Sequence, residues 1–191
     1  MSATECVQFE KKLAFHTAPS LLGIKCANLV SLKKSDFHVQ KHIACFNQKT
    51  AVKNLKMRIL CSYTDRVLIF IYSEKLLEKQ LVQYRSILME YGYPEYLTIE
   101  NALAMLSAHM QNSRDHHEFP HEIGIFLGYP IEDVLGFIEN HGENYVFSGY
   151  WKVYGNAEQA RRTFSNYDKC RTFLCNKLNQ GCNIYQALRI Q

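Results

Sequence analysis

The sequence predicts an α/β protein of the mixed α+β type, with a single domain over residues 1–191. We expect a mixed sheet of about four strands, one hairpin among them, and about six helices. A chain of 191 residues with 47% hydrophobic side chains is large enough to bury a substantial core. The apolar run at 67–72 is typical of a buried strand, and apolar residues recur every three or four positions over 77–91, as in a helix.

The first part of the chain predicts helices that alternate with strands. A short helix over 5–15 is expected to end at Pro19, because the residue before a proline avoids the helical conformation. A first strand is predicted over 24–32, where apolar and β-branched side chains follow one another. Ser35 or Asp36 is then expected to cap the next helix, because a short polar side chain can accept a bond from an exposed backbone N–H group.

Two strands and a block of helices are predicted next. Residues 55–63 and 66–72 are rich in strand-forming side chains, and the short polar connection between them favours a hairpin. Ser73 is expected to start a helical block that covers about 74–141 and precedes the last strand. Pro130 fits the first position of one of these helices, and the acidic residues that follow it suit the helix dipole.

The last strand is predicted over 145–154, a stretch of aromatic and β-branched residues. Strand alternation would place Trp151 on one face and Tyr150 and Tyr154 on the other, so that at most part of this strand lines a pocket. Core packing is the simpler role for these rings, and a stacking surface for a flat cofactor is the alternative. Asn156 is expected to cap the final helix.

Charge is distributed unevenly along the chain, although its formal net value is only +4. Residues 118–145 carry six acidic side chains and no basic one, whereas residues 146–191 carry seven basic and two acidic side chains. The basic surplus is too scattered to predict binding to nucleic acid, which requires Lys and Arg concentrated on one surface. The two segments of opposite charge either pack together or present surfaces to a protein partner.

The cysteines and the start of the chain predict a reducing, cytoplasmic location. Seven cysteines are an odd number, and residues 1–6 show no charged segment leading into an apolar run, as a signal peptide would. The longest apolar run, at 67–72, is far shorter than the roughly 20 residues that span a bilayer. We therefore expect no membrane span.

Three segments carry a family resemblance, namely 16–29, 119–134, and 149–154 together with 167–171. Through them nearly the whole chain resembles a bacterial family catalogued as domain of unknown function 3793. Where the family pattern has a cysteine, this chain has Thr17, so a thiol at that position is not essential to this member. The resemblance implies no activity, substrate or cofactor, and it suggests a redox or iron context.

The histidine-rich stretch around residue 120 contains the letters of a zinc motif. Residues 117–121 read H-E-x-x-H, which binds zinc through two histidines one helical turn apart. Pro120 would cost about 3 kcal/mol in the continuous helix that this motif requires, so no metal is favoured. The weak metal candidates are His117, His121 and Glu122, which rest on the density of ligand-type residues alone, and solvated loop side chains are the alternative.

A small-anion site is the second chemical possibility. Lys25 and Lys152 fall in predicted strands, and ligands collect at strand ends in helix-covered sheets, where lysine can hold a carboxylate or phosphate. Solvated lysines are the alternative. The candidate ligand-binding residues are His16, Lys25, His121, Glu122, Trp151 and Lys152. Convergence of His16, Lys25, Glu122 and Lys152 on one pocket would support this site.

No nucleotide-binding or catalytic motif is present, so the sequence favours a non-enzymatic small-ligand-binding or accessory protein. Its partner would be a small anion or a protein, and the sequence identifies no cofactor. The alternative is an enzyme that uses His121 and Glu122 as metal ligands or as acid and base, or one that uses the Cys170 thiol as a nucleophile.

Overall fold

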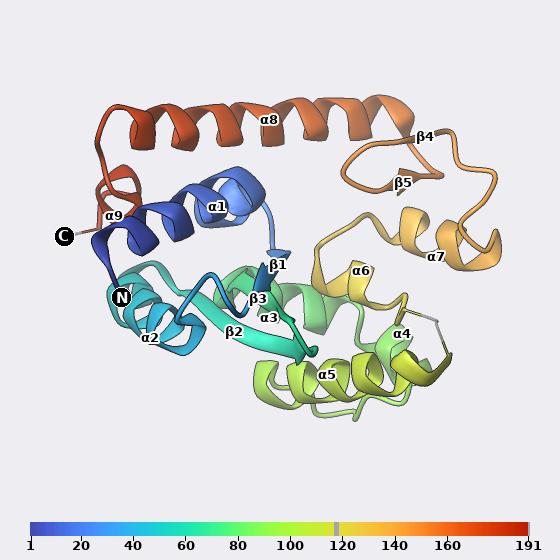
Figure 1. Ribbon diagram of the computed structural model, residues 1–191. Coiled ribbons are helices and arrows are strands. Elements are labelled where there is room, and N and C mark those ends of the chain that lie inside the picture. Colours follow the sequence, from blue (N-terminus) through green and yellow to red (C-terminus); the bar gives the residue numbers. More distant parts are fainter. Residues whose placement is uncertain (117–118, 191) are drawn as a thin grey trace. The chain divides into compact units, whose positions relative to one another are not determined.

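The structure of the chain, a computed structural model, describes residues 1–116 and 119–190, without the side chains of 113–116. The chain divides into two compact units, one formed by Met1–Leu77 with Lys169–Gln191 and the other by Glu78–Asp168. Figure 1 shows the order of the elements along the chain. Helices and strands are mixed, as predicted, and the single domain over 1–191 stays a prediction.

The prediction of one mixed sheet with about four strands is wrong. The described residues form a three-stranded sheet and a separate two-stranded sheet, both antiparallel. They also form nine α-helices where the sequence predicts about six, because short helical turns escape a periodicity that needs several turns to be recognised.

The three-stranded sheet belongs to the first unit. It contains β1 (Ala27–Lys33), β2 (Leu55–Ser62) and β3 (Arg66–Ser73), with β3 in the centre and both neighbours antiparallel to it. The hairpin between β2 and β3 is therefore confirmed. Across β1 and β3, the Arg66 guanidinium donates from Nε to Ser31 Oγ at 2.6 Å.

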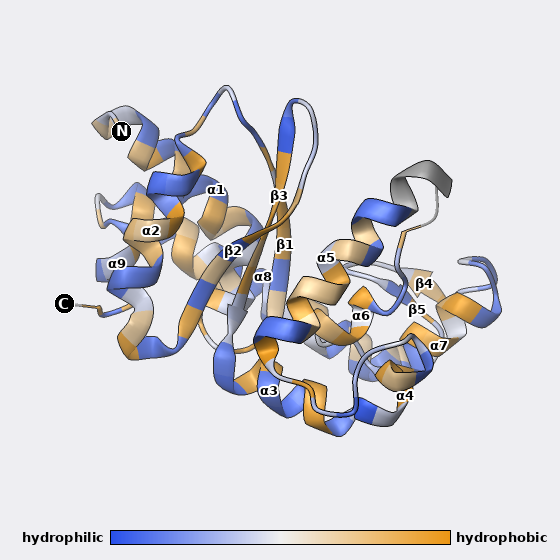
Figure 2. Cartoon of the chain, turned by 90° about the horizontal axis from the view of Figure 1, so that it is seen from below, coloured by the Kyte–Doolittle hydropathy of each residue, from blue (hydrophilic) through white to orange (hydrophobic). Residues whose placement is uncertain are grey.

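Helices of the first unit cover one face of this sheet. The helices α1 (Ala3–Leu21) and α2 (Val39–Thr50) contact the strands, and Figure 1 shows both beside the sheet. Figure 2 colours α2 in hydrophilic and hydrophobic bands, as expected of a helix that buries one side. The core side chains come from all these elements and from the C-terminal helices, and include Phe9, Leu13, Val30, Leu32, Phe46, Met57, Ile69, Ile71, Leu174 and Ile184.

Three expected boundaries of the first unit are wrong. The helix α2 begins at Val39 with His38 as its N-cap and no side-chain cap bond, so the expected cap at Ser35 or Asp36 does not form. The helix α1 continues past Pro19 to Leu21, because a proline in the last turn removes only one backbone donor. The carbonyl of Pro19 accepts bonds from the N–H groups of Ile24 and Lys25 at 2.8 and 3.1 Å. These residues therefore still wrap around the helix end, and β1 begins only at Ala27, so that Lys25 lies outside the strand.

The second unit consists mainly of helices. The helix α3 (Glu74–Gln83) leads into it from the first unit, and α8 (Ala157–Asn179) leads out again. Between them lie α4 (Arg85–Glu90), α5 (Ile99–His116), α6 (Ile123–Phe126) and α7 (Ile131–Glu139). Two more short helices, η1 (Ala51–Lys53) and α9 (Ile184–Ala187), belong to the first unit. None of the described helices has the length and apolarity to cross a membrane.

The aromatic stretch predicted as the fourth strand is a tight hairpin. It pairs β4 (Phe147–Ser148) with β5 (Lys152–Val153), separately from the first unit's sheet. The turn occurs at Gly149, whose N–H donates to the Trp151 carbonyl at 3.0 Å. A Cβ atom at Gly149 would lie 2.3 Å from the Phe164 ring, so only glycine fits this close approach. The reversal ends the alternation that an extended strand would have.

Candidate functional site

The second unit contains a cavity of about 240 Å³. It lies where four segments meet: the stretch before α6, the helix α6, the helix α7, and the turn between β4 and β5. Most lining residues are aromatic or aliphatic, and a histidine, an aspartate and a lysine complete the lining. The full set is Phe119, His121, Ile123, Gly124, Tyr129, Asp133, Val134, Phe137, Tyr150, Trp151 and Lys152. A cavity of about 150 Å³ holds benzene, so this one has room for roughly two fused rings.

Trp151 forms the main aromatic wall of this cavity. Its indole stacks on the Tyr129 ring with the centroids 4.9 Å apart and the planes at 29°. The indole also contacts the Phe164 ring of α8, which meets it edge-on at a centroid distance of 4.5 Å. Trp151 is only 8% exposed, and these neighbours hold its ring in one orientation. The wall is therefore formed before any ligand arrives.

Asp133, in the first turn of α7, holds Trp151 in place through a hydrogen bond. Its Oδ2 accepts a hydrogen bond from the indole Nε1 at 2.6 Å, and its Oδ1 accepts from the backbone N–H groups of Tyr154 and Gly155 at 2.7 and 2.8 Å. The side chain is buried, and a buried carboxylate is stable only when its oxygens are bonded in this way. Asp133 is thus a positioning residue that joins α7 to β5.

Two further polar side chains belong to the cavity wall. Lys152 donates from Nζ to the carbonyl oxygen of Gly142 at 2.6 Å, and its Nζ lies 4.8 Å from the Tyr145 ring centroid. An ammonium group has three donors, so this bond leaves Lys152 two N–H groups for water or a ligand. His121 is exposed, and its ring meets Phe137 edge-on at 5.1 Å. The cavity thus combines a cation and an imidazole with aromatic walls.

Three of the six predicted ligand-binding residues line this cavity: His121, Trp151 and Lys152. Tyr150 lines it as well, although strand alternation predicts the opposite face from Trp151. That expectation is wrong because the chain reverses at Gly149, so successive residues no longer alternate between two faces.

Glu122 is turned to a different set of partners. Its Oε1 lies 2.6 Å from His109 Nδ1 and accepts a hydrogen bond from the Tyr93 hydroxyl at 3.3 Å. Burial, together with the negative charge of Glu122, raises the pKa of Tyr93, so the phenol stays protonated and donates. Glu122 is buried and links α5 to the start of α6, apart from the cavity that its neighbour His121 lines.

His16 and Lys25 belong to the first unit. His16 is exposed on α1, and its pKa is lowered by partial burial and by the nearby charges of Lys12 and Arg171. Lys25 is 4% exposed, and burial lowers its pKa to about 7. Since each unit is described by itself, a site that combines these residues with Lys152 stays a prediction.

The sequence also suggested a metal site in the histidine-rich stretch and a nucleophilic thiol at Cys170. His117 and Glu118 are outside the described residues, and Phe119 and Pro120 are not helical. Among the side chains that the structure describes, 1–112 and 119–190, no three from His, Cys, Asp or Glu gather as a metal site would require. Cys170 is half-buried on α8, and burial raises its pKa, whereas a nucleophilic thiol needs a lowered one.

Sequence reasoning did not identify Tyr129, Asp133 or Phe137 as site residues. The sequence marked Asp133 only as an acidic residue in the first turn of a helix. Its bond to Trp151 joins residues 18 positions apart, and no periodicity or motif encodes such a pair. Neither Tyr129 nor Phe137 differs in the sequence from an ordinary core aromatic.

The fold and the cavity define a small mixed α+β protein with an aromatic-walled pocket in its second unit. Residues 13–188 match the family described as "Protein of unknown function (DUF3793)", and the chain belongs to that family. The match confirms the resemblance predicted from the sequence. No curated protein and no solved structure matched the chain.

Proposed function

We propose that this chain is a non-enzymatic ligand-binding or accessory protein, and that the pocket beside Trp151 binds a small, flat, negatively charged aromatic molecule. The observation that carries the proposal is the indole wall, which Asp133 holds and which lines the same cavity as Lys152. Small-molecule sites typically combine such apolar walls with a few placed polar groups.

The cavity's size limits the ligand to one or two rings. The volume of about 240 Å³ is larger than the roughly 150 Å³ that holds benzene, and it lies below the range of roughly 300–1,000 Å³ typical of drug-sized ligands. A haem or a three-ring flavin is too large to be enclosed there. Aromatic rings of the ligand would stack against Trp151 and its neighbours at offset or edge-on angles.

The charge of the ligand follows from the ionisable groups of the wall. Asp133 already accepts three hydrogen bonds, so its carboxylate is compensated within the protein. Lys152 makes one bond to a carbonyl and can offer two further N–H groups to a carboxylate. A ligand carboxylate next to Lys152 would gain a charge-assisted hydrogen bond, whereas a cation would be repelled.

The enzymatic alternative has weaker support. His121 lines the cavity but Glu122 bonds to His109 and Tyr93, so the two residues do not form an acid and base pair around one reacting group. The raised pKa of Cys170 disfavours the thiolate that a nucleophile needs. We keep a cytoplasmic setting and the redox or iron context as part of the proposal, and the seven free thiols favour a reducing compartment.

A thermal-shift panel tests the proposal. Benzoate and naphthalene-2-carboxylate are expected to raise the melting temperature, while flavin, haem and naphthalene-2-carboxamide are not. The Lys152→Met variant should lose most of the stabilisation by naphthalene-2-carboxylate, and the exposed Lys79→Met variant should keep it. Equal stabilisation by the carboxamide and the carboxylate would contradict the role of Lys152. Absence of stabilisation by either aromatic acid would contradict the proposed ligand class.

A further inference from the structure

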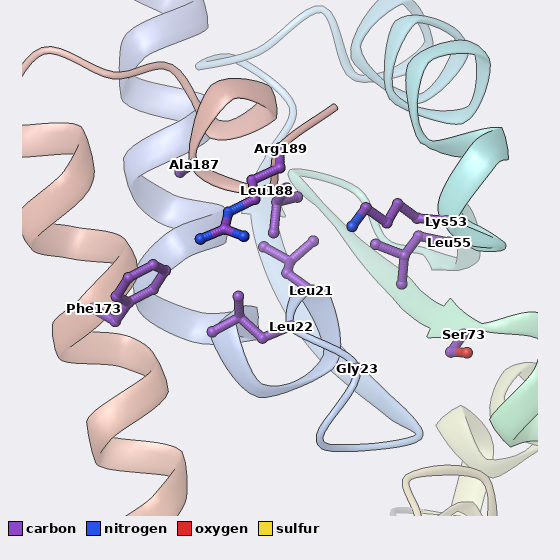
Figure 3. A pocket seen from close by; sticks show the side chains of 10 residues that line it. All are labelled: Leu21, Leu22, Gly23, Lys53, Leu55, Ser73, Phe173, Ala187, Leu188 and Arg189. Carbon is purple, nitrogen blue, oxygen red and sulfur yellow. The ribbon is translucent and has the colours of Figure 1, made fainter. Parts of the chain in front are cut away.

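The first unit contains a second cavity, of about 340 Å³, which the proposed function does not use. It lies where α1 ends, where η1 leads into β2, and where α9 ends (Figure 3). Its floor is aliphatic: Leu21, Leu55 and Leu188 are at most 5% exposed, and Leu22 is half-buried. Phe173 of α8 stands at the rim and is 45% exposed.

Two cations stand over this apolar floor. Figure 3 shows the Arg189 guanidinium and the Lys53 amine on opposite sides of Leu21 and Leu188. Both basic residues are exposed, and the lining set, which lies wholly within the described chain, contains no acidic residue. The cavity therefore has an apolar bottom and a positively charged opening.

The backbone at Arg189 shows that an arginine is unusual at this position. Arg189 follows the C-cap of α9 with φ of +55°, in the left-handed region that favours glycine. Its N–H donates to Gln186 and the N–H of Ile190 donates to Tyr185, which is the Schellman pattern of helix ends. Glycine would serve this turn with less strain, so local backbone geometry does not explain the guanidinium.

Two helices end at this cavity, and the partial negative charge of a helix C-terminus opposes an anion. Local backbone bonds reduce this effect here. The Pro19 carbonyl in α1 accepts from Ile24 and Lys25, and the Tyr185 carbonyl in α9 accepts from Ile190. The last carbonyls are thus used within the protein, and the two full positive charges dominate the field at the opening.

We propose that this cavity binds an anionic amphiphile, a carboxylate that carries an aliphatic chain of medium length. The leucine floor suits a hydrocarbon chain, because burial of apolar surface is favourable and non-directional. Arg189 presents the planar donor pair that matches a carboxylate, and Lys53 adds a second cation on the opposite side of the leucine floor. The volume of about 340 Å³ falls within the usual range for small-molecule sites.

Isothermal titration calorimetry with octanoate tests this site on the full chain. Octanoate is expected to bind, octylamine is not, and acetate should bind at least tenfold more weakly because it lacks the chain. The variants Arg189→Gly and Lys53→Gln should each weaken octanoate binding about tenfold, as expected for the loss of a charge-assisted hydrogen bond. The matched control Lys169→Gln, an exposed position on α8, should bind as the unchanged protein does.

Arg189→Gly separates binding from folding. Glycine relieves the left-handed backbone strain at 189, so this variant should melt at the same or a higher temperature while it loses octanoate affinity. The indole N–H resonance of Trp151 reports the other pocket and should not move with octanoate. Equal affinity of Arg189→Gly and the unchanged protein, binding of octylamine as tight as that of octanoate, or a shift of the Trp151 resonance would overturn the assignment.

Discussion

Replacement of Asp133 by alanine should destabilise the second unit, because three donors lose their acceptor at once. Gly155 is exposed, so water can replace the bond at its N–H, whereas the indole of Trp151 is 8% exposed and Tyr154 is half-buried. A buried donor without an acceptor costs about 1–3 kcal/mol. Two such donors give a predicted loss of about 2–6 kcal/mol in the free energy of unfolding.

Urea unfolding followed by fluorescence measures this loss directly, since Trp151 is the one tryptophan of the chain and is itself the partner of Asp133. Glu132→Ala is the matched control, because Glu132 is also an acidic residue in the first turn of α7 but is exposed. Both variants lose the same helix-dipole contribution, so their difference isolates the hydrogen bonds. Equal unfolding midpoints for the two variants would refute the positioning role of Asp133.

Three other substitutions test the packing inside each unit taken by itself. No described residue bonds the buried Tyr154 hydroxyl, so Tyr154→Phe should raise the free energy of unfolding by about 1 kcal/mol in urea titrations; a loss would show a hidden partner. Gly149→Ala places a Cβ 2.3 Å from the Phe164 ring and should cost about 2 kcal/mol by the same assay, and an unchanged unfolding midpoint would contradict the close approach. Lys25 has a folded-state pKa of about 7, so the unfolded chain binds more protons between about pH 7 and 10.4, and stability should rise with pH there by about 5 kcal/mol. Lys25→Met should abolish this rise, and an unchanged pH profile would contradict the burial of the charge.

Local sequence signals predicted many elements of this fold. The apolar run at 67–72 lies in the central strand β3, and Asn156 accepts from the Gln159 N–H at the start of α8, as expected of a cap. These features depend on neighbours within a few positions, which is why propensity and capping rules detect them.

The predictions that failed concern features that depend on contacts between residues distant in the sequence. At the Gly149 turn, the Phe164 ring, 15 positions away, leaves no room for a side chain. The pattern of residues at 145–154 does not reveal the contact with that ring, so the sequence predicted one longer strand. In the same way, Lys25 was assigned to a strand because the sequence does not show its N–H bonding back to Pro19.

Hydrogen bonds made by charged side chains join the acidic segment 118–145 to the basic segment 146–191 at the candidate site. The carboxylate of Asp133, from the acidic segment, bonds to the indole and to two backbone N–H groups of the basic segment. Lys152, from the basic segment, bonds to the carbonyl of Gly142 in the acidic one. These contacts join the two segments within the second unit, but each of them links a charged side chain to a neutral group, so pairing of the opposite charges stays a prediction.

The most direct test of the central claim follows the indole N–H resonance of Trp151 in ¹⁵N-labelled protein during titration with naphthalene-2-carboxylate. A single tryptophan gives one indole cross-peak, and its N–H lies in the pocket wall. We predict a saturable shift of this peak, weakened about tenfold by Lys152→Met and unchanged by Lys79→Met. A peak that does not move at saturating ligand, or that moves equally in the Lys152→Met variant, would contradict an aromatic-anion site beside Trp151.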